Sequence, residues 1–582
     1  MAQLTQNVET KETWNGTLIL GSGHAGTPLA SAFVAGRRTA IIEKAQQYET
    51  GGMSPTKSMI SSGSGVAHIA HSRAPNDYGM QRNAGSNANI SGSGSSDGSG
   101  NGNNDGSADS RSGTANNDNN PKSNNNGNDK DEGDDDGVQA EDMVEIRQER
   151  KRNVVAGGFS SGNERNRLIE AGVDILKGEA TFIGPKTLCI RMRHDLEDRK
   201  ADEEEHADRA QGRMGRTAKV SERTVTGELV FINVGEAPSR PDIAGLEGIE
   251  DDRVLNSTST MELEAVPKHL IVLGGGYIGL EFGQLFRRLG AQVTIAQRGK
   301  RLVPREDPDI AECMLDILTE DGITVHLGCT ATAFTPNDND DDGTLPFTLN
   351  IVTDSNESLS IPGSHVLLAT GSTLNTTSLN LDAVGINTTP RGHIVVDEKL
   401  ATTAQGVYAL GDVHVGPGFA QMSYDDFRII RANLIPPEKT PSSSTTPLTS
   451  HLILNAQARP INTAASTSKS RNIVPYVIYT DPQLGHVGLH DRDLEDLKKA
   501  GRKIQTAKMA ISTRGMMKAS VDAETGEVLG FTCLGIEGGE VMAIMQVAMM
   551  AGVKWRDMGN AVWAHPSLSE SLNSLWQFLK ES

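Results

Sequence analysis

A strand, a glycine-rich turn and a helix follow one another twice in this 582-residue chain, and this repeat restricts the possible folds more than any other feature. The first copy is Gly21-Ser-Gly23-His-Ala-Gly26, which comes directly after the apolar run 17–20 and opens a predicted helix. Gly21 allows the tight turn, Gly23 lets the backbone approach a pyrophosphate, and Gly26 permits close packing of helix and strand. Glu43 ends the next predicted strand, where a carboxylate can accept hydrogen bonds from ribose hydroxyls. This order of elements predicts a dinucleotide-binding unit.

The second copy, Gly274-Gly-Gly276-Tyr-Ile-Gly279, lies about 250 residues later and again connects a strand to a helix. Its second strand ends at Gln297, where an acid would favour NAD, and Arg298 follows. A neutral residue beside an arginine suits the 2′-phosphate of NADP, so we expect NADP(H) to be favoured over NAD(H). The alternative is that Arg298 and the basic residues that follow it, Lys300 and Arg301, form only a solvated loop. Two fingerprints in one chain point to FAD plus NAD(P)H.

Strands alternate with helices over most of the chain, which predicts parallel sheets covered on both faces. After residue 472 the pattern changes to that of a separate α/β domain. Three segments are poor candidates for order: 83–137 is almost entirely Gly, Ser, Asn and Asp, 194–222 is dense in charge, and 435–471 is rich in Pro, Ser and Thr. We expect them to be two solvated inserts and a low-complexity linker.

Composition excludes several classes of partner. The formal net charge of -20 argues against nucleic acid or an anionic membrane surface, and no apolar run reaches the roughly 20 residues that span a bilayer. The four cysteines, Cys189, Cys313, Cys329 and Cys533, form no short-spaced pair. Neither they nor the histidines, His486 among them, show metal-ligand spacing, so we expect no metal site and a cytoplasmic, reducing compartment.

Four further motifs identify a family. They are Phe231-Ile-Asn-Val-Gly235, Leu367-Leu-Ala-Thr-Gly371, Val407-Tyr-Ala-Leu-Gly411-Asp412-Val413 and Ala564-His565-Pro-Ser-Leu-Ser-Glu570. With the two fingerprints, they resemble the class I pyridine nucleotide-disulfide oxidoreductases, which include glutathione reductase, dihydrolipoamide dehydrogenase and mercuric reductase. The segments 303–307 and 423–428 most resemble the mercuric-reductase-like branch.

The resemblance implies an α/β architecture with two doubly wound, Rossmann-like nucleotide-binding domains, for FAD and NAD(P), and a C-terminal α/β dimerisation domain. It also implies a homodimer. We expect these bounds: the first part of the FAD domain at 14–262, the NAD(P) domain at 263–372, the second part of the FAD domain at 373–434, the linker at 435–471 and the dimerisation domain at 472–582.

The resemblance also implies roles for individual residues. Lys57 matches the family lysine near flavin N5, and Glu281 matches its ion-pair partner. His565 matches the family acid/base, oriented by Glu570 and presented to the flavin site of the other subunit. Asp412 matches the aspartate that hydrogen-bonds the ribityl chain of FAD. The remaining matched positions, all expected to contact FAD or NAD(P), are Gly52, Gly235, Gly371 and Gly411.

One departure decides the predicted reaction. Where the family carries Gly-Gly-Thr-Cys, four residues and Cys-Ile-Pro-Thr-Lys, this chain reads Gly51-Gly52-Met-Ser-Pro55-Thr56-Lys57, without either redox cysteine. We therefore expect hydride transfer from NAD(P)H to FAD and then direct electron transfer to a small acceptor: a quinone, oxygen or an unsaturated metabolite. Two alternatives stay open. The protein could be a mercuric or disulfide reductase whose redox segment is missing from this version of the sequence, or a non-catalytic, FAD-binding dimeric scaffold.

Overall fold

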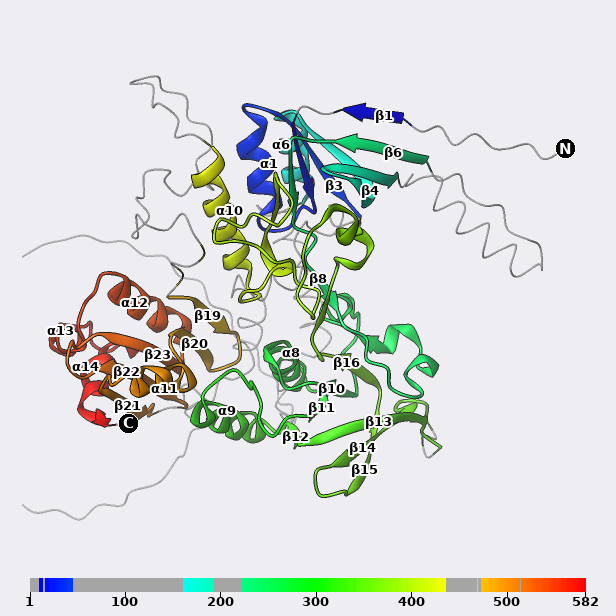
Figure 1. Cartoon of the computed structure of the whole chain (residues 1–582). Coiled ribbons are helices and arrows are strands. Elements are labelled where there is room, and N and C mark those ends of the chain that lie inside the picture. The colour runs from blue at the N-terminus through cyan, green and yellow to red at the C-terminus, as the bar shows by residue number, and fades with distance from the viewer. Residues whose placement is uncertain are drawn as a thin grey trace, which may run out of the picture. The chain divides into compact units, whose positions relative to one another are not determined.

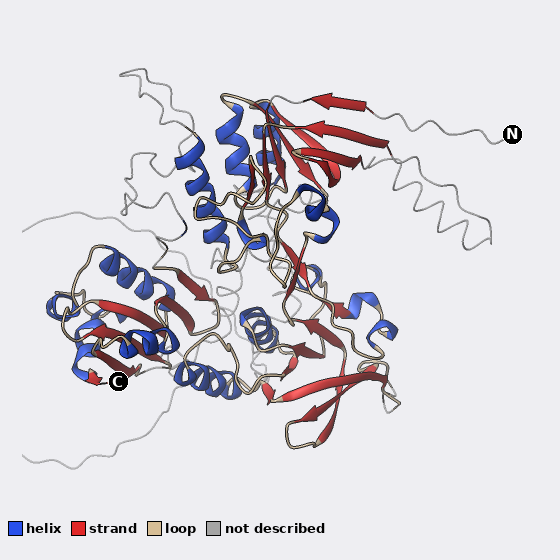
Figure 2. Ribbon diagram, in the orientation of Figure 1, coloured by secondary structure: helices blue, strands red, loops and turns tan. Residues whose placement is uncertain are grey.

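A computed structural model describes residues 10–13, 16–44, 161–192, 221–338, 340, 342–435, 468, 471, 473–512 and 514–581. Within these residues the chain builds three large sheets with their covering helices (Figure 1). Helices and strands alternate through the first two sheets, while the third is antiparallel (Figure 2). No described helix is long and apolar enough to cross a bilayer.

The first sheet has eight strands in the order β1-β6-β5-β4-β3-β2-β7-β18, and its β4-β3-β2-β7-β18 part is parallel. Its strands are β1 Thr10–Thr13, β2 Gly16–Leu20, β3 Arg38–Glu43, β4 Val173–Gly184, β5 Thr187–Met192, β6 Ser221–Thr226, β7 Leu229–Ile232 and β18 Val407–Ala409. Its helices are α1 Gly26–Val34, α6 Ser161–Glu170 and α10 Ala420–Leu434.

Alternate residues of β2 enter two different cores. Ile19 packs with Leu29 and Phe33 of α1 and with Phe427 of α10, whereas Leu18 faces the core on the other side of the sheet. Successive strand residues point to opposite faces, so a continuous apolar run gives a strand that is covered on both sides.

The second sheet is parallel, with five strands in the order β12-β11-β10-β16-β9. Its strands are β9 Val254–Leu255, β10 His269–Leu273, β11 Gln292–Gln297, β12 Thr324–Leu327 and β16 His365–Leu368. One core contains helices α8 Tyr277–Arg288 and α9 Pro308–Glu320. The other contains the antiparallel strands β13 Cys329–Pro336, β14 Phe347–Thr353 and β15 Ser358–Gly363. A short pair, β8 Glu236–Pro238 with β17 Ser372–Leu374, connects the first and second sheets in the chain.

The third sheet has six antiparallel strands in the order β19-β20-β23-β22-β21-β24. They are β19 Pro475–Ile478, β20 Gln483–Gly488, β21 Ile504–Ala510, β22 Met516–Asp522, β23 Val528–Gly535 and β24 Lys580–Glu581. The helices are α11 Asp491–Lys499, α12 Gly538–Met550, α13 Trp555–Asn560 and α14 Ser571–Leu575. Ile478, Leu484 and Leu534 are buried in the same core as helices α8 and α9 of the second sheet.

The predicted fold class is confirmed: two α/β bodies with largely parallel sheets are followed by an α/β domain with an antiparallel sheet. The C-terminal helical segment consists of three short pieces, η8 Leu568–Glu570, α14 and η9 Trp576–Phe578. A 3₁₀ turn at each end tightens the helix where its terminal groups lack α-helical partners. The domain boundaries stay predictions, and the insert 83–137 lies outside the described residues.

Candidate functional site

The two glycine turns have the same backbone geometry. Gly21 N–H donates to the carbonyl of Ile42 at 2.9 Å, and Gly274 N–H donates to that of Ala296 at 2.9 Å. Gly21 has φ +93° and Gly274 φ +111°, which side chains rarely adopt. A Cβ at Gly21 would also lie 2.4 Å from the carbonyl oxygen of Asn233, so the close approach of two strand ends requires glycine here.

The other fingerprint glycines follow the pattern that the sequence predicts. A Cβ on Gly26 or Gly279 would lie 2.2 Å from the carbonyl oxygen of the first glycine of its own turn. Among the described residues, no atom lies within 4 Å of such a Cβ at Gly276, and only the side chain of Asn233 lies near one at Gly23, at 3.3 Å. The middle glycines therefore leave the backbone open to a ligand.

The residue that ends the second strand of each unit binds the turn directly. Glu43, which is 6% exposed, accepts the Ser22 N–H at 2.7 Å through its carboxylate. Gln297 Oε1 accepts the equivalent Gly275 N–H at 2.9 Å, and its Nε2 donates to the Arg301 carbonyl at 3.1 Å. The amide at 297 thus repeats the bond that the carboxylate makes at 43, but without a charge.

Arg298 is exposed on the loop directly after Gln297. Lys300, two residues on, is 87% exposed and lies 3.9 Å from Asp354. A neutral strand end beside an accessible guanidinium can accommodate a phosphate.

Asn233, which was not among the predicted site residues, has its side chain beside three predicted cofactor positions: Gly23, Gly26 and Gly411. Its N–H donates to the Leu20 carbonyl at 2.8 Å, and its side chain lies against the Cβ positions of Gly26 and Gly411, at 3.0 and 3.1 Å. It stands inside the motif Phe231–Gly235, directly after β7, and a polar residue at the carboxyl end of a central strand was the available signal. Gly235 and Gly371 follow β7 and β16 with φ +64° and +113°, and no atom of the described part of the chain lies within 4 Å of a Cβ on either.

The fit of a dinucleotide to the first turn can be tested on the side chains around it. Ser22 Oγ is buried and has no hydrogen-bond partner among the described residues. It stands between Gly21 and Gly23, at the start of α1, where backbone N–H groups favour a phosphate. Asp412 lies in a one-turn 3₁₀ helix, η6 Gly411–Val413, that follows β18. These residues fit the pyrophosphate and ribityl groups of FAD.

Glu281 is the most unusual titratable group of the site. It is 1% exposed on α8, and its Oε1 accepts the Tyr479 N–H at 2.8 Å. Its Oε2 is buried and has no partner among the described residues. Burial raises the pKa of Glu281 to about 8, although the bond from Tyr479 opposes the rise. A carboxylate held this way would be strongly stabilised by a cation. The expected partner, Lys57, lies outside the described residues, as does Gly52.

His565 and Glu570 form a pair on the surface. His565 Nδ1 lies 2.8 Å from Glu570 Oε2, and the two side chains are 79% and 41% exposed. Since the carboxylate occupies Nδ1, Nε2 remains to exchange a proton. Within one chain this pair is exposed while Glu281 is buried.

The cysteines lie in four separate regular elements: Cys189 in β5, Cys313 in α9, Cys329 in β13 and Cys533 in β23. Cys329 Sγ donates to the carbonyl of Gln297 at 3.7 Å. None of the four forms a disulfide. Burial raises the pKa of Cys313 and Cys329, and raises that of Cys533 to about 12.

One cluster brings together residues for which the sequence showed no ligand spacing. Atoms of Glu306, His486 and His490 lie within 4.8 Å of one another. The two imidazole rings stack in parallel at 3.7 Å, and His486 uses both nitrogens, on Thr532 Oγ1 at 2.8 Å and the Gly488 carbonyl at 3.2 Å. Ring lone pairs lie in the ring plane, so parallel rings do not converge on one ion. The cluster is a hydrogen-bonded contact between the segment before α9 and the third sheet, since the Tyr476 hydroxyl of β19 donates to Glu306 at 2.6 Å and lies 3.0 Å from His490 Nε2.

Comparisons with known proteins agree with this geometry. The family model described as pyridine nucleotide-disulphide oxidoreductase matches residues 16–426, and the model of that family's dimerisation domain matches residues 474–575. A probable pyridine nucleotide-disulfide oxidoreductase of Escherichia coli, RclA, is 29% identical over 445 residues, which are 75% of this chain and 86% of the relative. The mercuric reductase of Streptomyces lividans is 32% identical over 359 residues, 60% of this chain and 67% of that protein.

The solved structure titled HOCl-induced flavoprotein disulfide reductase RclA, from Escherichia coli, has the same fold. It superposes with a TM-score of 0.64 at 24% identity and covers 97% of this chain and 100% of its own.

Proposed function

Because the chain belongs to the pyridine nucleotide-disulphide oxidoreductase family, whose members use FAD and a pyridine nucleotide, we propose that it passes electrons from NADPH through FAD directly to a small acceptor, without a redox disulfide. The acceptor is a quinone, oxygen or an unsaturated metabolite. We place the reaction in the cytoplasm, a reducing compartment in which the four cysteine thiols would stay reduced.

The placement of the cysteines carries this proposal. A disulfide relay needs two thiols close together, at least one of them a ready thiolate. Here the four thiols lie in four separate elements, and burial keeps three of them protonated. A protonated thiol is a weak nucleophile, so these side chains are poorly suited to a relay.

FAD, when bound, supplies hydride acceptance and electron release. The chain's own residues bind and orient it: Gly21, Gly23 and Gly26 at the pyrophosphate, Glu43 at the ribose and Asp412 at the ribityl chain. In the second unit Gly274, Gly276 and Gly279 would hold the pyridine nucleotide, with Arg298 at the 2′-phosphate. The neutral amide of Gln297, bonded to Gly275 N–H, supports the preference for NADPH, because it puts no negative charge beside that phosphate.

Lys57 and Glu281 would form the ion pair beside the flavin. The buried Oε2 of Glu281 supports this role, since it has no hydrogen-bond partner among the residues that the structure describes and an ammonium group there would satisfy it. A cation so placed stabilises negative charge on the ring system during reduction.

His565 and Glu570 would hold or deliver the proton that the reduced acceptor takes up. Their exposure in the single chain supports action across a homodimer interface, which the matched dimerisation domain would form.

Anaerobic titration with NADPH, and in parallel with NADH, tests the proposal. We expect NADPH to bleach the flavin band of the holoenzyme more efficiently, without a long-wavelength charge-transfer band between thiolate and flavin. Addition of a quinone, air or an unsaturated carbonyl compound should then restore the band. A charge-transfer band on two-electron reduction would refute the disulfide-free route, and a flavin that neither nucleotide reduces would refute the activity itself.

A further inference from the structure

A buried carboxylate on α10 fixes the turn that carries Asp412. Asp426 is 1% exposed, and its Oδ2 accepts two hydrogen bonds: one from Gly411 N–H at 2.7 Å and one from His414 Nε2 at 2.9 Å. Gly411 and His414 stand at the two ends of that turn, and His414 N–H also donates to the Gly411 carbonyl at 3.3 Å. A single carboxylate oxygen therefore ties the start of the turn to its end.

Arg471, which lies outside the turn, balances the charge of Asp426. The other oxygen of Asp426 binds the Arg471 guanidinium, which also donates from Nε to Asp425 at 2.8 Å. His414 Nδ1 lies 3.0 Å from the carbonyl of Val415. Both ring nitrogens of His414 thus face acceptors. The Arg471 guanidinium compensates the buried carboxylate, and the bond between them is charge-assisted.

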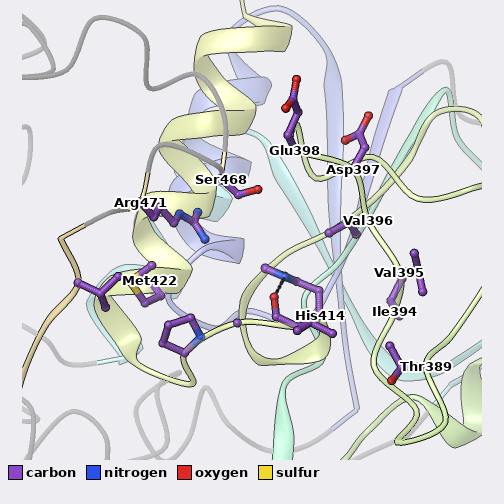
Figure 3. A pocket seen from close by; sticks show the side chains of 14 residues that line it. Thr389, Ile394, Val395, Val396, Asp397, Glu398, His414, Met422, Ser468 and Arg471 are labelled. Atoms are coloured by element: carbon purple, nitrogen blue, oxygen red, sulfur yellow. Dashed lines mark hydrogen bonds between the residues drawn. The ribbon is translucent and has the colours of Figure 1, made fainter. Parts of the chain in front are cut away.

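Packing alone does not fix the position of the Gly411–His414 turn, because the turn borders a cavity. His414, Met422 and Arg471 line a cavity of about 470 Å³, and Figure 3 shows their side chains around it. A turn that borders open space can shift when its bonds are lost. On its inner side Gly411 is packed closely, since a Cβ there would lie 2.9 Å from Ser423 Oγ of α10.

From this geometry we infer that Asp426 is a positioning residue for the flavin: it fixes the Gly411–His414 turn so that the Asp412 carboxylate is held ready for the ribityl hydroxyls. Asp426 acts through the turn and does not touch the cofactor. The inference rests on the proposed function for the role of Asp412, and it adds a residue that none of the glycine or Gly-Asp motifs contains.

The neighbouring aspartate provides a matched control. Asp425 also binds Arg471, but it is 34% exposed and lies outside the Gly411 and His414 bonds. In the purified holoenzyme we would compare Asp426→Asn, Asp425→Asn and His414→Gln. Three quantities are measured: FAD release on dilution, followed by flavin fluorescence; the circular dichroism of the bound flavin in the visible range; and the unfolding midpoint, followed by tryptophan fluorescence.

We expect Asp426→Asn to raise the FAD dissociation constant about tenfold or more and to change the visible dichroism, because an amide cannot replace a charged acceptor of two donors. His414→Gln should weaken binding about threefold or more, and it carries the test if Asp426→Asn does not fold. Asp425→Asn should stay within about twofold of the wild type.

Equal flavin affinity in Asp426→Asn and Asp425→Asn would overturn the inference. So would flavin loss that occurs only in step with unfolding, as a purely structural residue would produce. A wild-type holoenzyme that binds FAD but is reduced by neither nucleotide would refute the proposed activity and would not change the comparison of flavin affinities.

Discussion

Replacement of Lys518 by methionine should destabilise the protein much more than the same replacement of Lys508, because the ion pairs of Lys518 are buried and that of Lys508 is exposed. Lys518 lies on β22, its side chain is 3% exposed, and its Nζ lies 2.7 Å from Asp307, 3.1 Å from Asp309 and 2.6 Å from Asp491. Asp307 and Asp309 begin α9, so the ammonium joins the third sheet to the second nucleotide-binding body. Methionine keeps most of the aliphatic volume and removes only the charge and its bonds.

The magnitude follows from the burial of the partners. Removal of one member of a buried ion pair costs about 3–5 kcal/mol, because the remaining charge is left uncompensated. Asp307 is 8% exposed, but Asp309 and Asp491 are 24% and 43% exposed, so water screens part of the loss. We therefore expect Lys518→Met to lower the free energy of unfolding by the lower end of this range, about 3 kcal/mol. Lys508 also binds Asp309, at 2.6 Å, but is 52% exposed, and Lys508→Met should cost less than about 1 kcal/mol.

The pH dependence gives an independent check. Burial alone would raise the pKa of Asp307, but bonds from His490, Lys518 and the Asp491 N–H outweigh it and hold the pKa well below its usual range. A depressed carboxyl pKa contributes stability that is present above about pH 4 and is lost as the pH falls. Without Lys518 fewer bonds oppose the effect of burial, so the Asp307 carboxyl protonates at a higher pH. The loss in the free energy of unfolding of Lys518→Met, relative to the wild type, should therefore be largest near pH 7 and shrink towards about pH 4.

Urea unfolding followed by tryptophan fluorescence measures this effect. Three of the four tryptophans, Trp555, Trp563 and Trp576, lie in the C-terminal domain, so the signal reports that domain. For a slope of about 1–3 kcal/mol per molar urea, the midpoint of Lys518→Met should fall by about 1–3 M. Equal midpoints for Lys518→Met and Lys508→Met would refute the reasoning, and so would a deficit that does not change between pH 7 and pH 4.

Three further predictions concern the site. Lys57→Met should leave Glu281 protonated at neutral pH with a pKa of about 8, visible as a carboxylic acid band in infrared difference spectra against Glu281→Gln; a band equally strong in the wild type would contradict the ion pair. His565→Ala should leave flavin reduction by NADPH unchanged but slow reoxidation by a proton-requiring acceptor about 100-fold in stopped-flow traces, whereas equal rates would remove its proposed role. Gln297→Glu should keep the bond to Gly275 N–H and lower the ratio of kcat/KM for NADPH over NADH about tenfold or more; an unchanged ratio would leave the preference unexplained.

The local pattern of the sequence was enough to predict the nucleotide-binding bodies. Each βαβ unit is encoded within about 30 residues, so the apolar runs that became β2 and β10 and their glycine turns could be recognised directly. The pair His565 and Glu570, five residues apart, was predicted by resemblance to a short motif, and the two side chains do meet.

Contacts between distant segments could not be predicted in this way. The Tyr479 N–H that holds Glu281 is 198 residues away from it, and Lys518 lies 211 residues from Asp307. Periodicity tells which face of an element is buried but not which partner covers it. For the same reason the sequence showed only that position 297 lacks an acid. In the structure the amide of Gln297 accepts the Gly275 N–H, as the Glu43 carboxylate accepts the Ser22 N–H in the first unit.

The attachment of the third sheet to α8 and α9 has a dynamic consequence. Gln284 of α8 makes two bonds to the backbone of Asp481, at 2.7 and 2.8 Å, and the two bodies also share one apolar core. The second and third sheets should therefore open and close as one cooperative unit in hydrogen exchange. Large movement relative to the first sheet then requires the contacts of Phe419 and Gln421 with β19 to break, and it bends the chain at the narrow crossing made by β8 and β17. If the nucleotide enters by a swing of its domain, the dimerisation domain travels with it, and the crossing is the hinge.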